Sequence, residues 1–188
     1  PDLVLYLKPS SPLALDAISG IATPTQVGTA VGFSALLMSE YVPEECAITT
    51  IENYEKRIPI ARQNFVRAGK EKKITLLEGD AMDVLKTLEG PYDFIFMDAA
   101  KGQYIHYLPE ILRLLAKGGI LVSDNVMQDG DVIESRFAVE RRDRTIHARM
   151  REYLYELKHN DALVTSIIPL GDGVALSVKK EVGTDIAQ

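Results

Sequence analysis

Three oxygen-bearing side chains follow two apolar runs in the second half of the chain. Asp98 comes directly after "YDFIFM", and Asp124 and Asn125 come directly after "GILVS". If the two runs are neighbouring strands of a parallel sheet, these side chains meet at the carboxyl edge, where open α/β folds bind ligands. Hard oxygen ligands without nearby histidine or cysteine suit Mg²⁺, with Mn²⁺ or Ca²⁺ as alternatives, and do not suit zinc. The sequence therefore predicts a divalent metal site at Asp98, Asp124 and Asn125.

Each half of this cluster also has a simpler interpretation. Asp98 alone could cap the helix that follows it, and Asp124 with Asn125 could form an ordinary turn. The two endings occurring together, with a lysine beside one of them, favour the metal site.

Lys101 lies three positions after Asp98. A lysine at the start of a helix is usually solvated. Beside a divalent cation in a partly dry pocket, however, its neutral form becomes accessible and could accept the proton of a hydroxyl group. We therefore predict that Lys101 and Asp98 are the catalytic residues of a hydroxyl-activating site.

A glycine-containing turn lies near the start of the chain, in "QVGTAVGFSALLM". Gly28 and Gly32 would let the backbone approach a nucleotide-like ligand beside a helix N-terminus. The pattern is neither the Gly-x-Gly-x-x-Gly of pyrophosphate binders nor a P-loop. Taken alone, it could be a strand-to-helix turn that needs glycine.

An acidic residue at the end of the next strand favours a ligand-binding turn over a purely structural one. Glu52 lies 24 positions after Gly28, where such folds place a carboxylate on a ribose diol. In "EGDAM", Asp80 and Ala81 end the following strand, where an adenine ring could lie. S-adenosylmethionine contains adenosine without phosphate and fits these features better than NAD. An NAD-dependent oxidoreductase and a non-catalytic nucleotide-binding module are the alternatives.

The elements that must position these residues alternate along the chain. β-type runs are expected at 47–52, 73–79, 92–98 and 119–125, and helices at 54–68, 81–88, 104–115 and 144–158. The segment 125–143 is expected to be a loop with some helix. Two further β-type runs flank Gly171-Asp172-Gly173, as in a hairpin. The pattern predicts a doubly wound α/β fold with a mostly parallel sheet and a C-terminal antiparallel hairpin.

Composition sets the broad class. A chain of 188 residues, 46% hydrophobic and with a net charge of −6, is typical of one globular domain, which we predict over 1–188. No apolar run is long enough to cross a membrane. The single cysteine, Cys46, fits a reducing compartment, so a cytoplasmic location is expected. The chain begins without methionine, so we expect an incomplete N-terminal part, and we expect a frayed tail at 181–188.

Taken together, the chain resembles the metal-dependent O-methyltransferases of the catechol and caffeoyl-CoA type. The resemblance runs from about Gln26 to Lys179, through "VGTAVGFSA", "TTIE", "EGDA", "DAAKGQY", "SDNV" and "PLGDGVALS". It implies a class I methyltransferase sheet of seven strands, a homodimer, the metal ligands named above and Lys101 as the base. It also implies cofactor contacts at Gly28, Thr29, Ser34, Glu52, Ala81 and Asp98. Gln26 stands where the family usually has glutamate, and we include it among these contacts.

Within that family, the chain looks most similar to the bacterial tRNA 5-hydroxyuridine methyltransferases. This resemblance implies methylation at the tRNA wobble position, because 5-hydroxyuridine offers a metal the same two-oxygen chelation as a catechol. A run of arginines could contact phosphates, or could be a solvated helix face. They are Arg136, Arg141, Arg142, Arg144, Arg149 and Arg151. A small catechol-like molecule is the alternative acceptor.

One segment departs from the family pattern. In "SGIATPTQVGT", only Val27 supplies an apolar residue directly before Gly28, whereas a central buried strand normally needs more. We therefore expect residues to be absent from the chain between Lys8 and Gln26.

Overall fold

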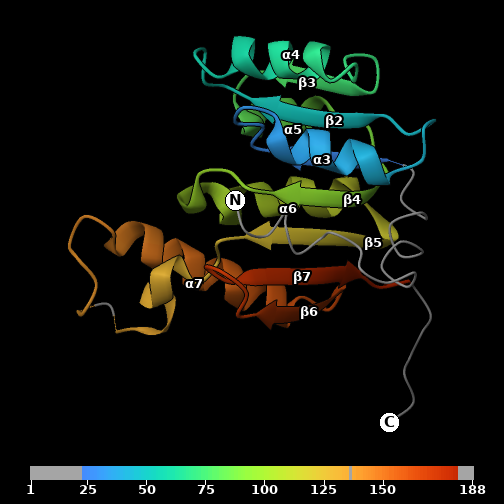
Figure 1. The fold of residues 1–188 in the computed structure, drawn as a ribbon. Helices are drawn as coiled ribbons and strands as arrows, with labels where there is room; N and C mark the ends of the chain where they lie inside the picture. Colours follow the sequence, from blue (N-terminus) through green and yellow to red (C-terminus); the bar gives the residue numbers. More distant parts are fainter. Residues whose placement is uncertain (1–22, 136, 182–188) are drawn as a thin grey trace.

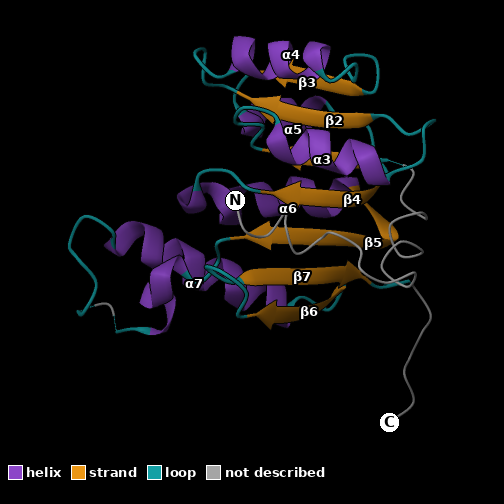
Figure 2. Cartoon of the chain, viewed as in Figure 1, coloured by secondary structure: helices purple, strands orange, loops and turns teal. Residues whose placement is uncertain are grey.

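The computed structural model of the chain describes residues 23–135 and 137–181. It shows one twisted sheet with helices on both faces (Figure 1, Figure 2). The strands are β1 (Pro24–Val27), β2 (Ile48–Glu52), β3 (Ile74–Glu78), β4 (Tyr92–Met97), β5 (Leu115–Asp124), β6 (Leu163–Ile168) and β7 (Val174–Lys179). The α-helices are α3 (Phe33–Tyr41), α4 (Ile58–Arg67), α5 (Ala81–Thr87), α6 (Tyr104–Leu114) and α7 (Arg144–His159). The described residues also form the 3₁₀ helices η1 (Lys101–Gln103) and η2 (Gln128–Ile133).

The strand order across the sheet is β3-β2-β1-β4-β5-β7-β6. The pairs among β1 to β5 are parallel, and β7 lies antiparallel between β5 and β6. The predicted fold is therefore confirmed, with seven strands and the C-terminal hairpin. The order reverses beside β1, which is where doubly wound sheets open a crevice for ligands.

The register of β4 against β5 sets the position of the acidic residues. Met97 is paired with Ser123, so Asp98 and Asp124 each follow one residue after a paired position. Parallel strands present their carboxyl ends at one edge, and these two acids are therefore neighbours there. The sequence-based prediction that both acidic endings converge is confirmed for the backbone.

Hydrophobic clusters hold the helices on opposite faces of the sheet. On one face, α5, α6 and α7 pack on the sheet through a large cluster that includes Leu85, Ile111 and Met150. On the other face, α3 and α4 pack through a smaller cluster that includes Ala35 and Phe65. This arrangement leaves the loops at the carboxyl edge free to form a site.

The central strand β1 corrects one sequence-based expectation. Although its sequence is PTQV, all four residues are buried, and β1 pairs with both β2 and β4. The Thr25 hydroxyl donates to the Thr49 carbonyl at 3.1 Å, and Gln26 Nε2 donates to the Gly28 carbonyl at 2.7 Å. These hydrogen bonds compensate in part for the burial of polar side chains in a central strand, although Gln26 Oε1 has no hydrogen-bond partner among the described residues. Apolar content was therefore the wrong criterion for this strand.

Three other expectations concern residues that lie outside the described ranges. The absent residues were expected within 8–26, most of which precedes residue 23, and the frayed tail falls in 182–188 apart from Glu181. The extent of a single domain over 1–188 depends on the same segments. All three remain predictions.

The other element boundaries agree closely with expectation, with two differences. The helix expected at 54–68 is α4, which begins at Ile58. The second difference is at β5. The strand begins at Leu115, directly after α6, so that Gly118 and Gly119 lie inside it. Lys179 Nζ donates to the carbonyls of Leu112 and Leu115, each at 2.7 Å, and thereby satisfies backbone acceptors where the helix ends and the strand begins.

Among the described residues, no helix is long and apolar enough to cross a membrane.

Candidate functional site

The loop after β5 fixes Asp124 and Asn125 through backbone contacts. Asn125 has a φ of +53°, a left-handed conformation that asparagine tolerates better than most residues. Its backbone N–H donates to Asp124 Oδ1 at 2.8 Å. The next two residues bond to the turn between β6 and β7, with Val126 N donating to the Gly173 carbonyl at 3.0 Å. The C-terminal hairpin therefore helps to hold this end of β5.

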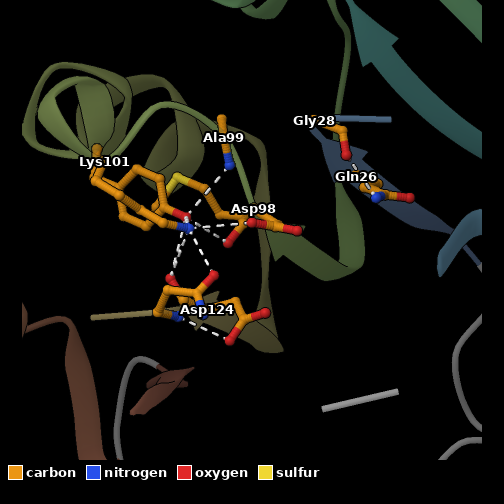
Figure 3. Close-up of polar contacts among 9 residues, drawn as sticks. Gln26, Gly28, Asp98, Ala99, Lys101 and Asp124 are labelled. Carbon is orange, nitrogen blue, oxygen red and sulfur yellow. Dashed lines mark hydrogen bonds and ion pairs between the residues drawn. The ribbon is translucent and has the colours of Figure 1, made fainter. Parts of the chain in front are cut away.

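Lys101 lies at the centre of the cluster (Figure 3). Its Nζ is 3.1 Å from Asp98 Oδ1 and 3.0 Å from Asn125 Oδ1. It also donates to the Asp124 carbonyl at 3.3 Å and to the Tyr104 hydroxyl at 3.1 Å. One ammonium group thus contacts all three residues that were predicted to bind a metal. Gly102, next to Lys101, is held by α7, because Arg149 donates to its carbonyl at 3.1 Å.

Negative charge exceeds positive charge among these groups. Two carboxylates, Asp98 and Asp124, face the single ammonium of Lys101. Burial raises the pKa of Asp124 above its ordinary value, and the charge of Asp98 acts in the same direction. The hydrogen bond from Asn125 N–H and the charge of Lys101 oppose the shift without cancelling it. A further cation would therefore be stabilised here.

The donor set fits a hard divalent cation. It consists of two carboxylates and one amide oxygen, which are preferred ligands of Mg²⁺, Mn²⁺ and Ca²⁺. Within residues 23–135 and 137–181, no group of three or more His, Cys, Asp and Glu side chains could hold a metal ion. That result is compatible with this set, because its third member is Asn125. A zinc site of the usual kind is not indicated.

The hydroxyl of Tyr104 joins the ends of β4 and β5 behind the cluster. It lies 3.0 Å from the Met97 carbonyl and 3.2 Å from the Asp124 carbonyl, and it accepts from Ala99 N–H at 3.3 Å. The side chain is fully buried. Burial, followed by the charge of Asp98, raises its pKa well above the ordinary value, so it remains a neutral phenol that can donate.

A cleft of about 540 Å³ runs from this cluster along the carboxyl edge of the sheet. Six of the residues predicted from the sequence line it: Gly28, Glu52, Ala81, Asp98, Lys101 and Asn125. Asp124 is outside the lining, although its carboxylate is near enough to feel the charge of Asp98. The cleft therefore connects the proposed metal ligands to the proposed ribose-binding acid.

Glu52 is buried at the end of β2 and is oriented by backbone donors. Its Oε2 accepts from Ala30 N–H at 2.7 Å, and its Oε1 accepts from Asn53 and Tyr54 N–H at 3.1 and 3.0 Å. A carboxylate has about four lone-pair positions, so Oε2 can still accept another hydrogen bond. Glu52 can thus bind a ligand hydroxyl without losing its own support.

Four of the predicted cofactor contacts are not among the described residues that line the cleft: Gln26, Thr29, Ser34 and Asp80. The Gln26 side chain is buried, and the Thr29 hydroxyl pairs with that of Thr50 at 2.7 Å. Asp80 caps α5 by accepting from Met82 N–H at 2.9 Å. The contacts made by Gln26, Thr29 and Asp80 therefore support the loops around the cleft.

Gly28 has a structural requirement in addition to the glycine-dependent turn that the sequence indicated. Its φ is +101°, and a Cβ atom there would lie 2.0 Å from the Asp98 carbonyl oxygen. Close approach between the ends of β1 and β4 thus demands glycine, whatever ligand occupies the cleft. The turn itself, with Gly32 at the start of α3, is as predicted.

The cleft has a wall that sequence reasoning missed. Tyr54 and Arg57 line it shortly after Glu52, with the Arg57 guanidinium 5.4 Å from the centre of the Tyr54 ring. Tyr107 of α6 also lines it. Their position after the acidic residue, in "ENYEKR", was the available signal for Tyr54 and Arg57.

Several arginines of the predicted phosphate-binding run have local backbone partners. Arg144 donates to the Val139 carbonyl at 3.2 Å. Arg151 donates to the carbonyls of Val132 and Glu134, at 3.2 and 3.4 Å, and so ties α7 to η2. Arg144 and Arg151 therefore position the segment between β5 and α7, whereas Arg149 contacts η1. Arg136 is outside the described residues.

Comparison with known proteins gives a consistent assignment. A family model described as O-methyltransferase matches residues 14–180. A catechol O-methyltransferase of Niastella koreensis is 35% identical over 113 residues, which is 58% of this chain and 51% of the relative. A caffeoyl-CoA O-methyltransferase of Populus trichocarpa is 33% identical over 168 residues, which is 80% of this chain and 64% of the relative. The chain thus spans between half and two thirds of the length of these curated relatives.

A solved structure supports the fold. The SAH-bound methyltransferase PaMTH1 of Podospora anserina superimposes with a TM-score of 0.79 and 26% sequence identity. The match covers 96% of this chain and 89% of that protein.

Proposed function

Because the chain belongs to the O-methyltransferase family, we propose that it methylates a substrate hydroxyl with S-adenosylmethionine and a divalent cation. The observation that carries this proposal is the convergence of Asp98, Asn125 and Lys101 at one end of a cleft that reaches Glu52. The SAH bound to PaMTH1, in a protein of the same fold, supports the choice of methyl donor.

The residues of the chain have separate tasks in this reaction. When bound, a divalent cation at Asp98, Asp124 and Asn125 would hold two neighbouring substrate oxygens and acidify the hydroxyl, while S-adenosylmethionine would supply the methyl group. Glu52 binds the ribose hydroxyls and orients the donor. Lys101 Nζ is the group that accepts the hydroxyl proton. An O–CH₃ bond then forms as the S–CH₃ bond breaks, leaving S-adenosylhomocysteine.

The acceptor we propose is a small catechol-like molecule. The two curated relatives described above are named for catechol and caffeoyl-CoA, which supports this choice. The backbone contacts of Arg144, Arg149 and Arg151 weaken the argument for a phosphate-binding surface. The wobble 5-hydroxyuridine of tRNA is the second candidate, favoured by the exposed side chains of Arg141 and Arg142. A homodimer and a cytoplasmic location remain part of the proposal.

A direct assay separates these acceptors. The purified protein is incubated with S-adenosylmethionine, Mg²⁺ and either a catechol panel or tRNA bearing unmethylated 5-hydroxyuridine, and the products are identified by mass spectrometry. We expect monomethylated catechols, and no product when EDTA removes the metal. Methylation of tRNA alone would establish the second candidate. Methyl transfer that is insensitive to EDTA would contradict the metal-dependent reaction.

Tyr104 is predicted to act as a positioning residue in this reaction. Tyr104→Phe removes the hydroxyl that contacts Lys101 Nζ and joins the ends of β4 and β5. We expect kcat to fall on the order of 10- to 100-fold, because Lys101 loses its orientation. The KM for S-adenosylmethionine should remain within about twofold, because the described lining of the cleft does not include Tyr104.

Steady-state kinetics check this prediction. Tyr153→Phe is a matched control: Tyr153 packs edge-on against Tyr104 with ring centroids 5.4 Å apart, and its hydroxyl pairs with Ser123 at 2.6 Å. Both variants lose a buried hydroxyl, so both should lose about 1–3 kcal/mol of unfolding free energy. Equal losses of kcat in the two variants would show that Tyr104 has only a structural role.

A further inference from the structure

The position of Lys101 suggests a role that precedes catalysis. Its Nζ contacts the side-chain oxygens of Asp98 and Asn125, the Asp124 carbonyl and the Tyr104 hydroxyl, all within 3.3 Å. It also lies 5.2 Å from the centre of the Tyr104 ring. Carboxylate, amide, carbonyl and ring face all favour a cation. The ammonium group therefore occupies the same cluster of oxygens that suits a divalent ion.

Asn125 Oδ1 is the atom for which Lys101 and a divalent cation would compete. Asp98 has a second carboxylate oxygen that it could offer to a metal, but the Asn125 side chain has only one oxygen, Oδ1. That atom already accepts from Lys101 at 3.0 Å. A metal at ordinary oxygen distances of about 2.0–2.6 Å would share this atom with a positive charge close by. The repulsion between the two cations disfavours simultaneous binding.

We propose that Lys101 is the resident cation of the metal-free site and that it leaves Asp98 and Asn125 when a divalent ion enters. The lysine thereby keeps the Asp98 carboxylate and the Asn125 amide assembled beside Asp124 before metal binding, at the cost of weaker metal affinity. Metal entry also releases Nζ from its acidic partner, so that it can turn toward the acceptor hydroxyl. This inference rests on the metal site of the proposed function and deepens it.

Metal binding without methyl donor or acceptor tests the competition. Mn²⁺ affinity is measured by calorimetry for the wild type, Lys101→Met and Lys101→Gln. We expect Lys101→Met to bind Mn²⁺ about tenfold more tightly or better, because both the repulsion and the competition for Oδ1 disappear. Lys101→Gln keeps a side-chain donor without the charge, so it should show a smaller gain. If Lys101→Met does not fold, Lys101→Gln still tests the competition.

A remote lysine provides the matched control. Lys86 on α5 is half-exposed and lies 3.9 Å from Asp83, so Lys86→Met removes the same charge away from the site. It should leave Mn²⁺ affinity unchanged. Thermal unfolding is a second readout: in EDTA, Lys101→Met should be less stable than the wild type, and Mn²⁺ should raise its melting temperature by more.

The outcomes separate the two proposals. Unchanged or weaker Mn²⁺ binding by both Lys101 variants would overturn the competition. Absence of Mn²⁺ binding in the wild type and in both variants would overturn the metal site as well. Binding that appears only after Lys101 is replaced would support the competition strongly. Loss of methyl transfer in a variant that binds Mn²⁺ more tightly would fit both roles of Lys101.

Discussion

Asp98→Asn is expected to abolish methyl transfer while leaving the fold intact. The change keeps the size of the side chain and one oxygen that can accept from Lys101, but it removes a charged ligand from the proposed metal site. Loss of an outer-shell partner already lowers metal affinity or activity by about 10- to 100-fold. Loss of a ligand itself should therefore weaken Mn²⁺ binding by about 100-fold or more. Calorimetry with Mn²⁺ and the methyl-transfer assay measure the two effects.

A control for charge is available on α5. Asp83 is largely exposed and pairs only loosely with Lys86, so Asp83→Asn removes one negative charge outside the cleft. We expect it to retain wild-type affinity for Mn²⁺ and full methyl transfer. If Asp98→Asn bound Mn²⁺ as tightly as this control does, the assignment of Asp98 as a ligand would be wrong.

Gly28→Ala is expected to damage both the fold and the cleft. An added Cβ would lie 2.0 Å from the Asp98 carbonyl oxygen, at a φ of +101° that alanine adopts only with strain. Positive-φ strain of about 1–2 kcal/mol and overpacking of about 1–3 kcal/mol should together cost about 2–5 kcal/mol. Because β1 and β4 must move apart at the cleft, affinity for S-adenosylmethionine should fall by at least about tenfold.

Gly69 isolates the contribution of backbone strain. Its φ is +67°, and a Cβ there meets nothing within 4 Å. Gly69→Ala should therefore cost only about 1–2 kcal/mol and leave ligand affinity unchanged. Urea unfolding and calorimetry with S-adenosylmethionine compare the variants. Equal stability of Gly28→Ala and Gly69→Ala would refute the close approach of the two strand ends.

The alternation of strands and helices was predictable because each element has a clear local signal. The ends of β4 and β5 are marked by the change from apolar residues to Asp98 and Asp124, so their convergence followed from topology. The strand β1 was not predictable in this way. Its polar residues are stabilised by partners such as Thr49 that lie far away in the sequence.

The contents of the site were predictable, but the contacts of its charged groups were not. The spacing from Asp98 to Lys101 indicated that the two residues meet. It did not show that Nζ reaches across to Asn125, because that contact depends on the left-handed backbone after β5. Likewise, an arginine such as Arg151 looks solvated in sequence, since its carbonyl acceptors belong to a separate segment.

The two alternative functions considered for the cleft have less support than methyl transfer. An NAD-dependent oxidoreductase has no support from the comparisons, which assign residues 14–180 to the O-methyltransferase family. A non-catalytic nucleotide-binding module would not need the grouping of Asp98, Lys101 and Asn125.

Anomalous diffraction from crystals grown with Mn²⁺ and S-adenosylhomocysteine would locate the metal relative to Asp98, Asp124 and Asn125. We predict one strong manganese peak bound by side-chain oxygens of Asp98, Asp124 and Asn125, with Lys101 Nζ displaced from Asn125 Oδ1. Manganese absent from these oxygens, with S-adenosylhomocysteine bound in the cleft, would contradict the account.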